Sequence, residues 1–176
     1  MNYCSKCLYP TSHPLNIILD KKNICSGCII HEEKNTLDWN KRFDKLNKII
    51  KSYKTKKKDM FDCIVPVSGG RDSHFILHIV KKILKLNPLI VDYNTHYNTE
   101  AGIRNLNYLK SIMGTTHFNL TTNPKKVKKI THTTLKKFGN IYWHCIAGQT
   151  VFPVQIACKM NIPLTIWGAH QGIDQV

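Results

Sequence analysis

The sequence predicts an α/β protein: an open, doubly wound parallel sheet of about four strands, preceded by a small cysteine-containing module. Short apolar runs of strand length alternate with longer segments of helical periodicity from residue 59 onward. A pair of glycines, Gly69 and Gly70, directly follows the first of these runs. Residues 1–35 instead hold two pairs of cysteines and show no helical period. A segment this short cannot form a sufficient core and needs a cross-link between its parts to fold.

Composition and charge limit the possible functions. The 176 residues are 42% hydrophobic, which is enough for a real core, and they carry a net charge of +15. A cationic protein favours polyanionic partners, but lysine runs at residues 41–58 and 125–137 are typical of solvated helix faces. We therefore do not expect a nucleic-acid partner, although the net charge does not exclude one. The sequence shows neither a membrane-span-length apolar run nor a signal peptide, so we expect a cytoplasmic protein.

Four cysteines follow the spacing Cys-x2-Cys, seventeen residues, Cys-x2-Cys. Each pair can place two thiolates on one tetrahedral ion, and four thiolates leave no position for water or substrate. The spacing predicts a structural zinc ribbon over residues 1–35, with an iron–sulfur centre as the alternative. The predicted ligands are Cys4, Cys7, Cys25 and Cys28.

The other three cysteines are interpreted as structural. Cys63 lies in an apolar run of strand type, and Cys158 falls on the predicted buried face of a helix. Cys145 follows His144, but neighbours in sequence seldom face each other, so we do not interpret it as an activated thiolate.

Residues 36–58 are predicted to form a connecting helix, and residues 59–176 the α/β domain. The connecting helix carries one apolar stripe, which we expect to pack against the next domain or a partner helix. The stripe consists of Trp39, Phe43, Leu46, Ile50 and Tyr53.

The elements of the α/β domain predict where ligands bind. Strands alternating with helices imply parallel pairing and right-handed crossovers, with ligands at the carboxyl ends of the strands. The chain stops about nine residues after the last predicted strand, so we expect the domain to be truncated at its C-terminus. Strands are predicted at residues 61–67, 89–91, 115–120 and 163–167, and helices at 75–84, 99–113 (with Ile103, Leu106, Leu109 and Met113 inward), 124–137 and within 144–160, where Pro153 starts or kinks the helix.

The glycine pair belongs to a loop, residues 68–73, with the sequence Ser-Gly-Gly-Arg-Asp-Ser. Glycine after a strand lets the backbone approach a phosphate without interference from a Cβ, and N–H groups of the next helical turn point at the anion. Ser68 and Ser73 can add hydrogen bonds, and the carboxylate of Asp72 can hold Mg²⁺ on the phosphates. The loop lacks the Gly-Lys-Ser/Thr ending of a Walker loop and the third glycine of a dinucleotide fingerprint.

This loop resembles the signature Ser-Gly-Gly-x-Asp-Ser of the PP-loop ATP pyrophosphatases. The resemblance implies that ATP is split between its α- and β-phosphates, giving AMP and pyrophosphate, after an oxygen of the substrate is adenylated. It also implies that Asp72 and Ser73 lie at the catalytic centre. The residues expected to bind ATP are Ser68, Gly69, Gly70, Arg71 at the variable position, Asp72, Ser73 and, beside the nucleoside, Asp92, Tyr93 and Asn94.

Other segments resemble the N-acetyl sugar amidotransferases of bacterial surface-glycan and nonulosonic acid synthesis, over about the first half of a typical member. The resemblance implies that ATP activates an acetamido oxygen of an N-acetylated sugar. Ammonia, made from glutamine by a separate glutaminase subunit, then gives an acetamidino sugar, as in modified pseudaminic or legionaminic acids or in the O-antigen of lipopolysaccharide. The resemblance rests on the opening Cys-x2-Cys and on residues 92–99, 102–106, 139–145 and 162–168.

The same resemblance gives roles to residues outside the loop. His144 and His170 are candidate catalytic residues, and Arg104 is a candidate substrate contact. His170, with Asp174, resembles a second phosphate-side motif that the chain ends before completing. Two alternatives stay open: a tRNA-thiolating or tRNA-modifying PP-loop enzyme, and an inactive remnant that acts only as a binding module.

Overall fold

The computed structural model describes residues 2–13, 17–54 and 60–168. These residues divide into two compact units, and the division falls between Lys48 and Ile49, inside the helix that was expected to connect the two parts of the chain. A search of the described helices finds none that combines the length and the apolar character needed to cross a bilayer.

The first unit has very little apolar core. Two isolated antiparallel bridges shape the segments that precede helix α1 (Ser26–Glu33). A short 3-10 turn (Lys34–Thr36) leads from α1 to α2 (Trp39–Tyr53). Within the described part of this unit only Cys4 and Cys25 are buried. A unit without a core of its own needs another source of stability, and its cysteines are the available one.

The apolar stripe predicted along α2 packs only at its C-terminal end. Ile50 is buried in the core of the second unit. The expectation that the stripe packs against the next domain therefore holds for Ile50 alone, because only the last part of α2 belongs to that unit. The exposed members of the stripe are Trp39, Phe43, Leu46 and Tyr53.

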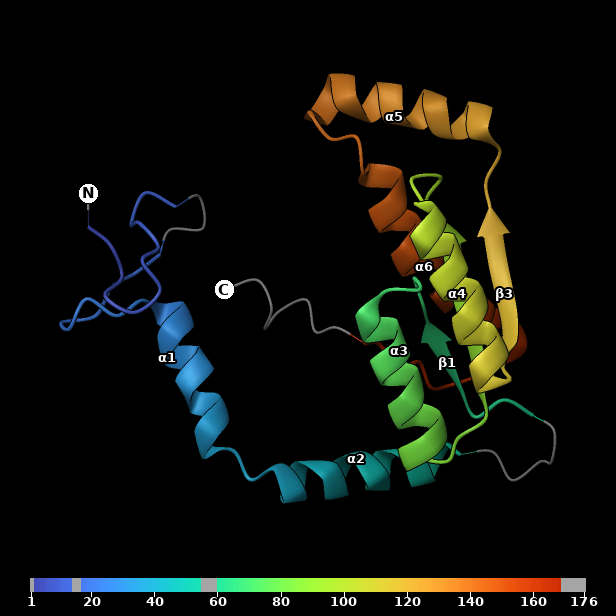
Figure 1. The fold of residues 1–176 in the computed structure, drawn as a ribbon, viewed down its shortest axis with the longest axis horizontal. Helices are drawn as coiled ribbons and strands as arrows, with labels where there is room; N and C mark the ends of the chain where they lie inside the picture. The colour runs from blue at the N-terminus through green and yellow to red at the C-terminus, as the bar shows by residue number, and fades with distance from the viewer. Residues whose placement is uncertain (1, 14–16, 55–59, 169–176) are drawn as a thin grey trace. The chain divides into compact units, whose positions relative to one another are not determined.

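The second unit is built on a parallel sheet. Strands β1 (Cys63–Pro66), β2 (Pro88–Asn94) and β3 (Thr116–Thr121) pair in the order β1-β2-β3, and both pairings are parallel. β1 and most of β2 are buried, which matches their nearly continuous apolar sequences, since strands covered on both faces need no polar alternation. The predicted fold class, an open α/β structure with a parallel sheet, is confirmed (Figure 1).

The fourth predicted strand, residues 163–167, is reduced to a single bridge. Thr165 pairs in parallel with Ile64 on the free edge of β1, where the N–H of Ile64 donates to the Leu164 carbonyl oxygen at 2.8 Å. Pro163 has no N–H group with which to extend the ladder. The described sheet therefore has three strands, with one further bridge beside β1.

Helices cover both faces of the sheet. One face is covered by α4 (Glu100–Met113) and by α3 (Arg71–His78), which continues as a π-helical turn (Ile79–Ile83). The other face is covered by α6 (Trp143–Met160), to which α5 (Pro124–Phe138) leads from β3 (Figure 1). This arrangement is the predicted doubly wound one. The first core includes Val65, Leu77, Val80, Ile90 and Leu109, and the second contains Ile64, Leu89, Val91 and Ile162.

Local sequence signals fix the ends of α4 and α5. The Thr99 hydroxyl accepts a hydrogen bond from the Gly102 N–H at 3.1 Å, which caps the N-terminus of α4. Gly114 ends α4 in a left-handed conformation. The side chain of Asn123 caps α5, and Pro124 occupies its first turn, where a missing N–H costs nothing.

Two residues of the second unit lie differently from expectation, and for a third the structure excludes one of two alternatives. Cys158 is exposed, because it lies two residues from the sheet-facing Ile156 and so on the other side of α6. Ile103 is 50% exposed, although Leu106 and Met113 do pack against the core. Pro153 lies inside α6, which begins ten residues earlier, and its ring is buried. The alternative in which it starts the helix is therefore wrong, and a kink at this residue stays a prediction.

Candidate functional site

A crevice opens at the carboxyl ends of β1 and β2. β1 lies between β2 and the bridge at Thr165, and helices on opposite faces of the sheet flank this position. Open α/β sheets bind ligands at such a switch point. A cavity of about 290 Å³ lies here. It is lined by Pro66, Val67, Ser68, Asp72, Ser73, Ile76, Val91, Asp92, Tyr93, Gln149, Pro153, Trp167 and Gly168.

The loop after β1 requires glycine at one position. Gly69 has a φ of +78°, in the left-handed region that side chains disfavour. A Cβ on Gly69 would lie 2.9 Å from the Cβ of Leu106 and 3.1 Å from the Gly102 carbonyl oxygen, because α4 packs directly against the loop. A Cβ on Gly70 would meet only the Ser68 hydroxyl, at 3.4 Å. The sequence shows the glycine pair, but only the fold shows why the first cannot be replaced.

The two serines of the loop hold it in shape. The Ser68 N–H donates to the Ser73 Oγ at 2.9 Å, and the two hydroxyl oxygens lie 3.2 Å apart. The Ser68 hydroxyl also accepts a weak hydrogen bond from the Gly70 N–H at 3.4 Å. Ser73 is buried, so its first role is to close the loop onto the start of α3.

The start of α3 can receive an anion. Gly70 is the N-terminal cap residue of α3, and no side chain caps the helix among the described residues. The first N–H groups of a helix have no partner within the helix, and its dipole makes this end positive. Negatively charged oxygens placed above the loop would therefore find both N–H donors and a favourable field.

Arg71 and Asp72 are exposed at the mouth of the loop. The Arg71 Nε lies 3.2 Å from the Asp72 Oδ1. Asp72 lines the cavity, whereas Arg71 is outside the set of lining residues. The Asp72 carboxylate is therefore accessible to a cation bound with phosphates, which is the arrangement Mg²⁺ prefers.

Asp92, at the carboxyl end of β2, is fixed by two side chains from β3. His117 Nε2 is in close contact with Asp92 Oδ1, and Asn119 Nδ2 donates to Asp92 Oδ2 at 2.6 Å. His117 and Asn119 are two positions apart on β3, so both point to the same face of the sheet. Neither residue was predicted from the sequence. The signal that could have identified them is that these two polar residues alternate along a strand that pairs with the strand of a buried aspartate.

We expect His117→Ala to lower the free energy of unfolding by about 1.5–3 kcal/mol, because it leaves a buried carboxylate with one partner fewer. His78→Ala, at an exposed position on α3, is the matched control and should change it by less than about 0.5 kcal/mol. Urea denaturation of both variants measures the difference. Equal stabilities for the two variants would show that the Asp92 contact contributes nothing.

A second cavity of about 400 Å³ adjoins the first and is rich in side-chain amides. Amides both donate and accept hydrogen bonds, so this cavity suits a neutral polar group with donors and acceptors of its own, such as a nucleobase or a ribose. Asp92, Tyr93 and Asn94, predicted beside the nucleoside, all line it. The amide side chains that line it are Asn94, Asn98, Asn107, Asn119 and Gln149.

Tyr93 lines both cavities and is held on three sides. Its ring lies so close to α6 that a Cβ on Gly148 would come within 2.5 Å of ring atoms. Its hydroxyl lies 3.2 Å from the Thr122 Oγ1 and 3.5 Å from the His144 Nδ1. The glycine at position 148 thus lets the tyrosine ring pack directly against α6, while it also lines both cavities.

His144 lies behind Tyr93 rather than in either cavity. It is buried, and desolvation, together with the neighbouring His96, lowers the pKa of its imidazole. Burial raises the pKa of the adjacent Cys145 thiol, whose Sγ lies 3.4 Å from His144 Nε2. Both shifts favour the neutral forms, so the pair is not an imidazolium–thiolate couple. The structural interpretation of Cys145 fits this, and a catalytic role for His144 stays a prediction.

One other candidate, Arg104, lies apart from the crevice. Arg104 is on the exposed face of α4, beside Glu100 and Tyr108, and lines neither cavity. The structure therefore does not bring Arg104 together with the residues that line the crevice, and its contact with a substrate stays a prediction. His170 and Asp174 lie outside the described residues.

The first unit carries a second candidate site, a metal centre. The four predicted cysteine ligands have their Sγ atoms within 4.8 Å of one another. Cys4 and Cys28 Sγ are 3.9 Å apart, and Cys7 and Cys25 Sγ are 3.5 Å apart. Thiolates about 2.3 Å from one tetrahedral zinc ion would be separated by about 3.8 Å, so the cluster fits a single ion. An iron–sulfur cluster holds its thiolates on different iron atoms and fits this compact set less well.

Backbone groups prepare this cluster for a metal. N–H groups of Lys6 and Cys25 donate to the Cys4 sulfur at 3.4 and 3.3 Å. Backbone hydrogen bonds, that of Cys7 foremost, lower the pKa of Cys4 to about 6, whereas desolvation and the neighbouring thiols raise the pKa of Cys28 to about 12. The Cys4 thiolate is thus readily available, and a bound cation would favour deprotonation of Cys28.

Comparison with known proteins gives one relative in sequence. No protein-family model matches the chain. An uncharacterized protein of Methanocaldococcus jannaschii is 32% identical over 105 residues, which cover 58% of this chain and 36% of that protein. The chain thus spans little more than a third of the length of this curated relative.

The solved structures that are similar in fold include two synthetases. The NH3-dependent NAD synthetase of Campylobacter jejuni, in complex with nitrate, has a TM-score of 0.47 at 17% identity, covering 71% of this chain and 54% of the synthetase. The NMN synthetase of Francisella tularensis has a TM-score of 0.46 at 16% identity, covering 56% of this chain and 42% of that enzyme. At these values the likeness concerns the arrangement of strands and helices alone.

Proposed function

We propose that this chain binds ATP in the crevice, with the phosphates on the loop of residues 68–73, as part of an AMP-forming amidating enzyme of the PP-loop kind. The observation that carries the proposal is the shape of this loop. Gly69 is packed so closely against α4 that a side chain has no room, and the loop presents the uncapped start of α3. Such a backbone is suited to phosphate groups, which approach it closely and accept its N–H groups.

The two cavities divide ATP between them. Phosphates on the loop face the first cavity, where the N–H groups at the start of α3 stabilise the negative charge that develops on departing pyrophosphate. Asp72 would hold Mg²⁺ there, which neutralises phosphate charge. The nucleoside occupies the amide-rich second cavity, next to Asn94 and Asn119. Asp92 and Tyr93 line both cavities. Because neighbouring side chains hold them in place, the position of the boundary between the two cavities is fixed.

The acceptor in this proposal is the acetamido group of an N-acetylated sugar. An amide oxygen is a poor leaving group, and adenylation converts it to a good one, which ammonia then displaces. The resemblance of residues 92–99 and 139–145 to the sugar amidotransferases supports this acceptor, and a separate glutaminase subunit would supply the ammonia. The Trp167 and Pro153 side chains give the first cavity an apolar wall on which a sugar ring can pack.

The cysteine cluster is proposed to hold zinc in a structural role. Four thiolates complete the tetrahedral shell and leave no open position for chemistry. The ion would replace the apolar core that the first unit lacks.

The cysteines of α6 argue against the thiolating alternative. A PP-loop enzyme that transfers sulfur would normally call for a cysteine pair near the loop. Cys145 is buried and Cys158 is exposed, and they lie thirteen positions apart in one helix, about 20 Å along its axis. Such a pair cannot form a disulfide without unfolding the helix.

The products of ATP turnover test the proposal. We expect incubation with ATP, Mg²⁺, an N-acetylated sugar and ammonium to release AMP and pyrophosphate, dependent on both the sugar and the ammonium. Release of ADP and phosphate would contradict it. The full-length Methanocaldococcus jannaschii relative, assayed in parallel, serves as a second arm: AMP formation by that protein alone would show that turnover needs residues beyond those of this chain.

A further inference from the structure

The basic charge of the second unit is concentrated where no acid balances it. From residue 101 to residue 173 the sequence contains no aspartate or glutamate. Helix α5 lies within this segment and carries six lysines and one histidine. No ion pair involves these lysines in the described part of the chain. Like charges three and four residues apart destabilise a helix, so this composition does not serve the stability of α5.

Most of these basic residues share one face of α5. Residues spaced by three, four, seven and eleven positions align along one side of a helix. The opposite side contains Val127 and Thr134, which are buried. We define the lysine stripe as Lys125, Lys128, Lys129, His132 and Lys136, all exposed.

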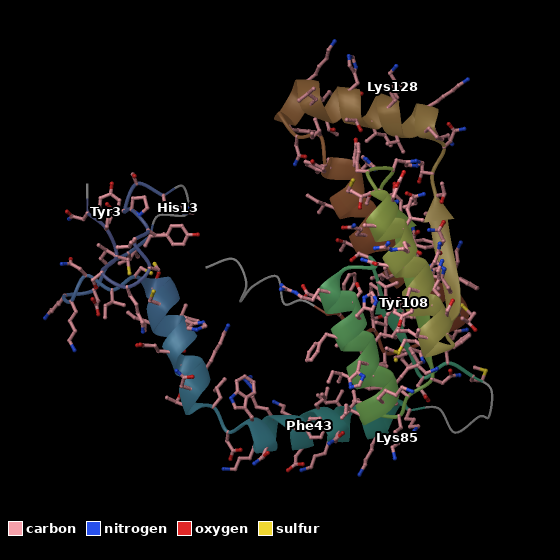
Figure 2. All side chains as sticks on the ribbon, viewed as in Figure 1. Tyr3, His13, Phe43, Lys85, Tyr108 and Lys128 are labelled. Atoms are coloured by element: carbon pink, nitrogen blue, oxygen red, sulfur yellow. The ribbon has the colours of Figure 1, made fainter. Side chains whose placement is uncertain are left out.

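The stripe borders a hollow that also contains aromatic groups. The hollow, of about 360 Å³, lies between α5 and the segment after β2, and is lined by Lys128, His132, His96 and Tyr97 among others. The ring of Tyr97 meets that of Tyr142 edge-on, with centroids 5.8 Å apart, and both rings are about half exposed. Figure 2 shows Lys128 on α5.

We propose that the lysine stripe, with Tyr97 and Tyr142, binds single-stranded nucleic acid. The stripe spans about 16 Å along the helix axis and complements a row of phosphates. The tyrosine pair offers faces and edges on which unpaired bases stack, the combination typical of single-strand binding surfaces. This inference goes beyond the proposed ATP chemistry and does not depend on it, because none of the stripe residues lines either cavity of the crevice.

Helix α2 provides a matched control within the same chain. It carries Lys41, Lys45, Lys48 and Lys51 at a similar spacing, all exposed, but Asp38 and Asp44 accompany them, and Lys41 pairs with Asp38 at 3.3 Å. Neutralising four lysines on either helix removes the same net charge. A difference between the two variants therefore reports position rather than total charge.

The test measures binding of a fluorescently labelled 12-nucleotide single-stranded RNA to the full chain by anisotropy. Replacing Lys125, Lys128, Lys129 and Lys136 by glutamine is expected to weaken binding at least tenfold, and to lower the slope of log affinity against log salt by about two to three. The α2 variant with the four matching glutamines should lose less than about threefold. Equal losses in the two variants would overturn the proposal, because binding would then follow net charge alone.

A second variant tests the aromatic part without touching the lysines. Tyr142→Leu is expected to weaken RNA binding about tenfold while leaving the affinity for inorganic polyphosphate unchanged. Unchanged RNA binding in this variant, or equal competition by polyphosphate and by an RNA of the same charge, would overturn the assignment to nucleic acid. Because this variant keeps every lysine, it decides the question even if the quadruple variant of α5 fails to fold, which circular dichroism would reveal.

Discussion

Replacing Gly69 by alanine is expected to lower ATP affinity on the order of a hundredfold and the free energy of unfolding by about 2–5 kcal/mol. The new Cβ would lie 2.9 Å from the Leu106 Cβ and 3.0 Å from the Leu106 backbone nitrogen, in a left-handed conformation. The strain of that conformation contributes about 1–2 kcal/mol and the overpacking about 1–3 kcal/mol. Because the backbone of α4 cannot give way cheaply, the loop must move, and a displacement near 1 Å is enough to disrupt phosphate binding.

Gly114→Ala is the control for the free-energy cost of placing alanine in a left-handed backbone conformation. Gly114 also has a positive φ, of +53°, but no atom lies within 4 Å of the position of its Cβ. This variant should lose about 1 kcal/mol of stability and keep its ATP affinity. Calorimetric titration with ATP and thermal unfolding of both variants separate strain from loop displacement. If Gly69→Ala binds ATP as tightly as Gly114→Ala, the phosphate site is elsewhere.

Removal of the zinc ion proposed for the cysteine cluster is expected to unfold the first unit and leave the second unit folded. Structural zinc contributes on the order of 10–16 kcal/mol of binding free energy in small metal-stapled peptides, and this unit has almost no core to replace it. Metal analysis should find one zinc per chain. After chelation, trypsin should cleave rapidly at Lys21 and Lys22, while residues 60–168 resist.

Cysteine variants give the matched control for the metal. Cys25→Ser removes a buried ligand of the cluster, whereas Cys158→Ser changes an exposed cysteine outside it. The first variant should reproduce the cleavage pattern of the chelated protein and the second should behave as the unaltered chain. Visible absorption from bound iron, or a first unit that resists trypsin without any metal, would contradict the zinc assignment.

The sequence predicts those parts of this fold that depend on local signals. The helices predicted at residues 99–113 and 124–137 agree with α4 and α5 to within one residue at each end, where Thr99, Gly114 and Pro124 start or stop them locally. The cysteine spacing predicts a cluster whose thiols do lie together. In both cases nearby residues in the chain determine the geometry.

Features that depend on distant residues could not be predicted in this way. Asp92 is held by His117 and Asn119 through the register of β2 and β3, which no local pattern specifies. The clash that makes Gly69 irreplaceable arises from α4, more than thirty residues away in the chain. The burial of Cys158 was predicted wrongly because α6 is apolar around most of its circumference, so periodicity does not identify its sheet-facing side.

Backbone amide chemical shifts, recorded while a non-hydrolysable ATP analogue and Mg²⁺ are added, test the central claim most directly. The account predicts that the largest shifts fall on the N–H groups of residues 68–73, followed by the side-chain amides of Asn94 and Asn119. Saturable shifts confined to the lysines of α5 or to the cysteine cluster, with residues 68–73 unchanged, would contradict it.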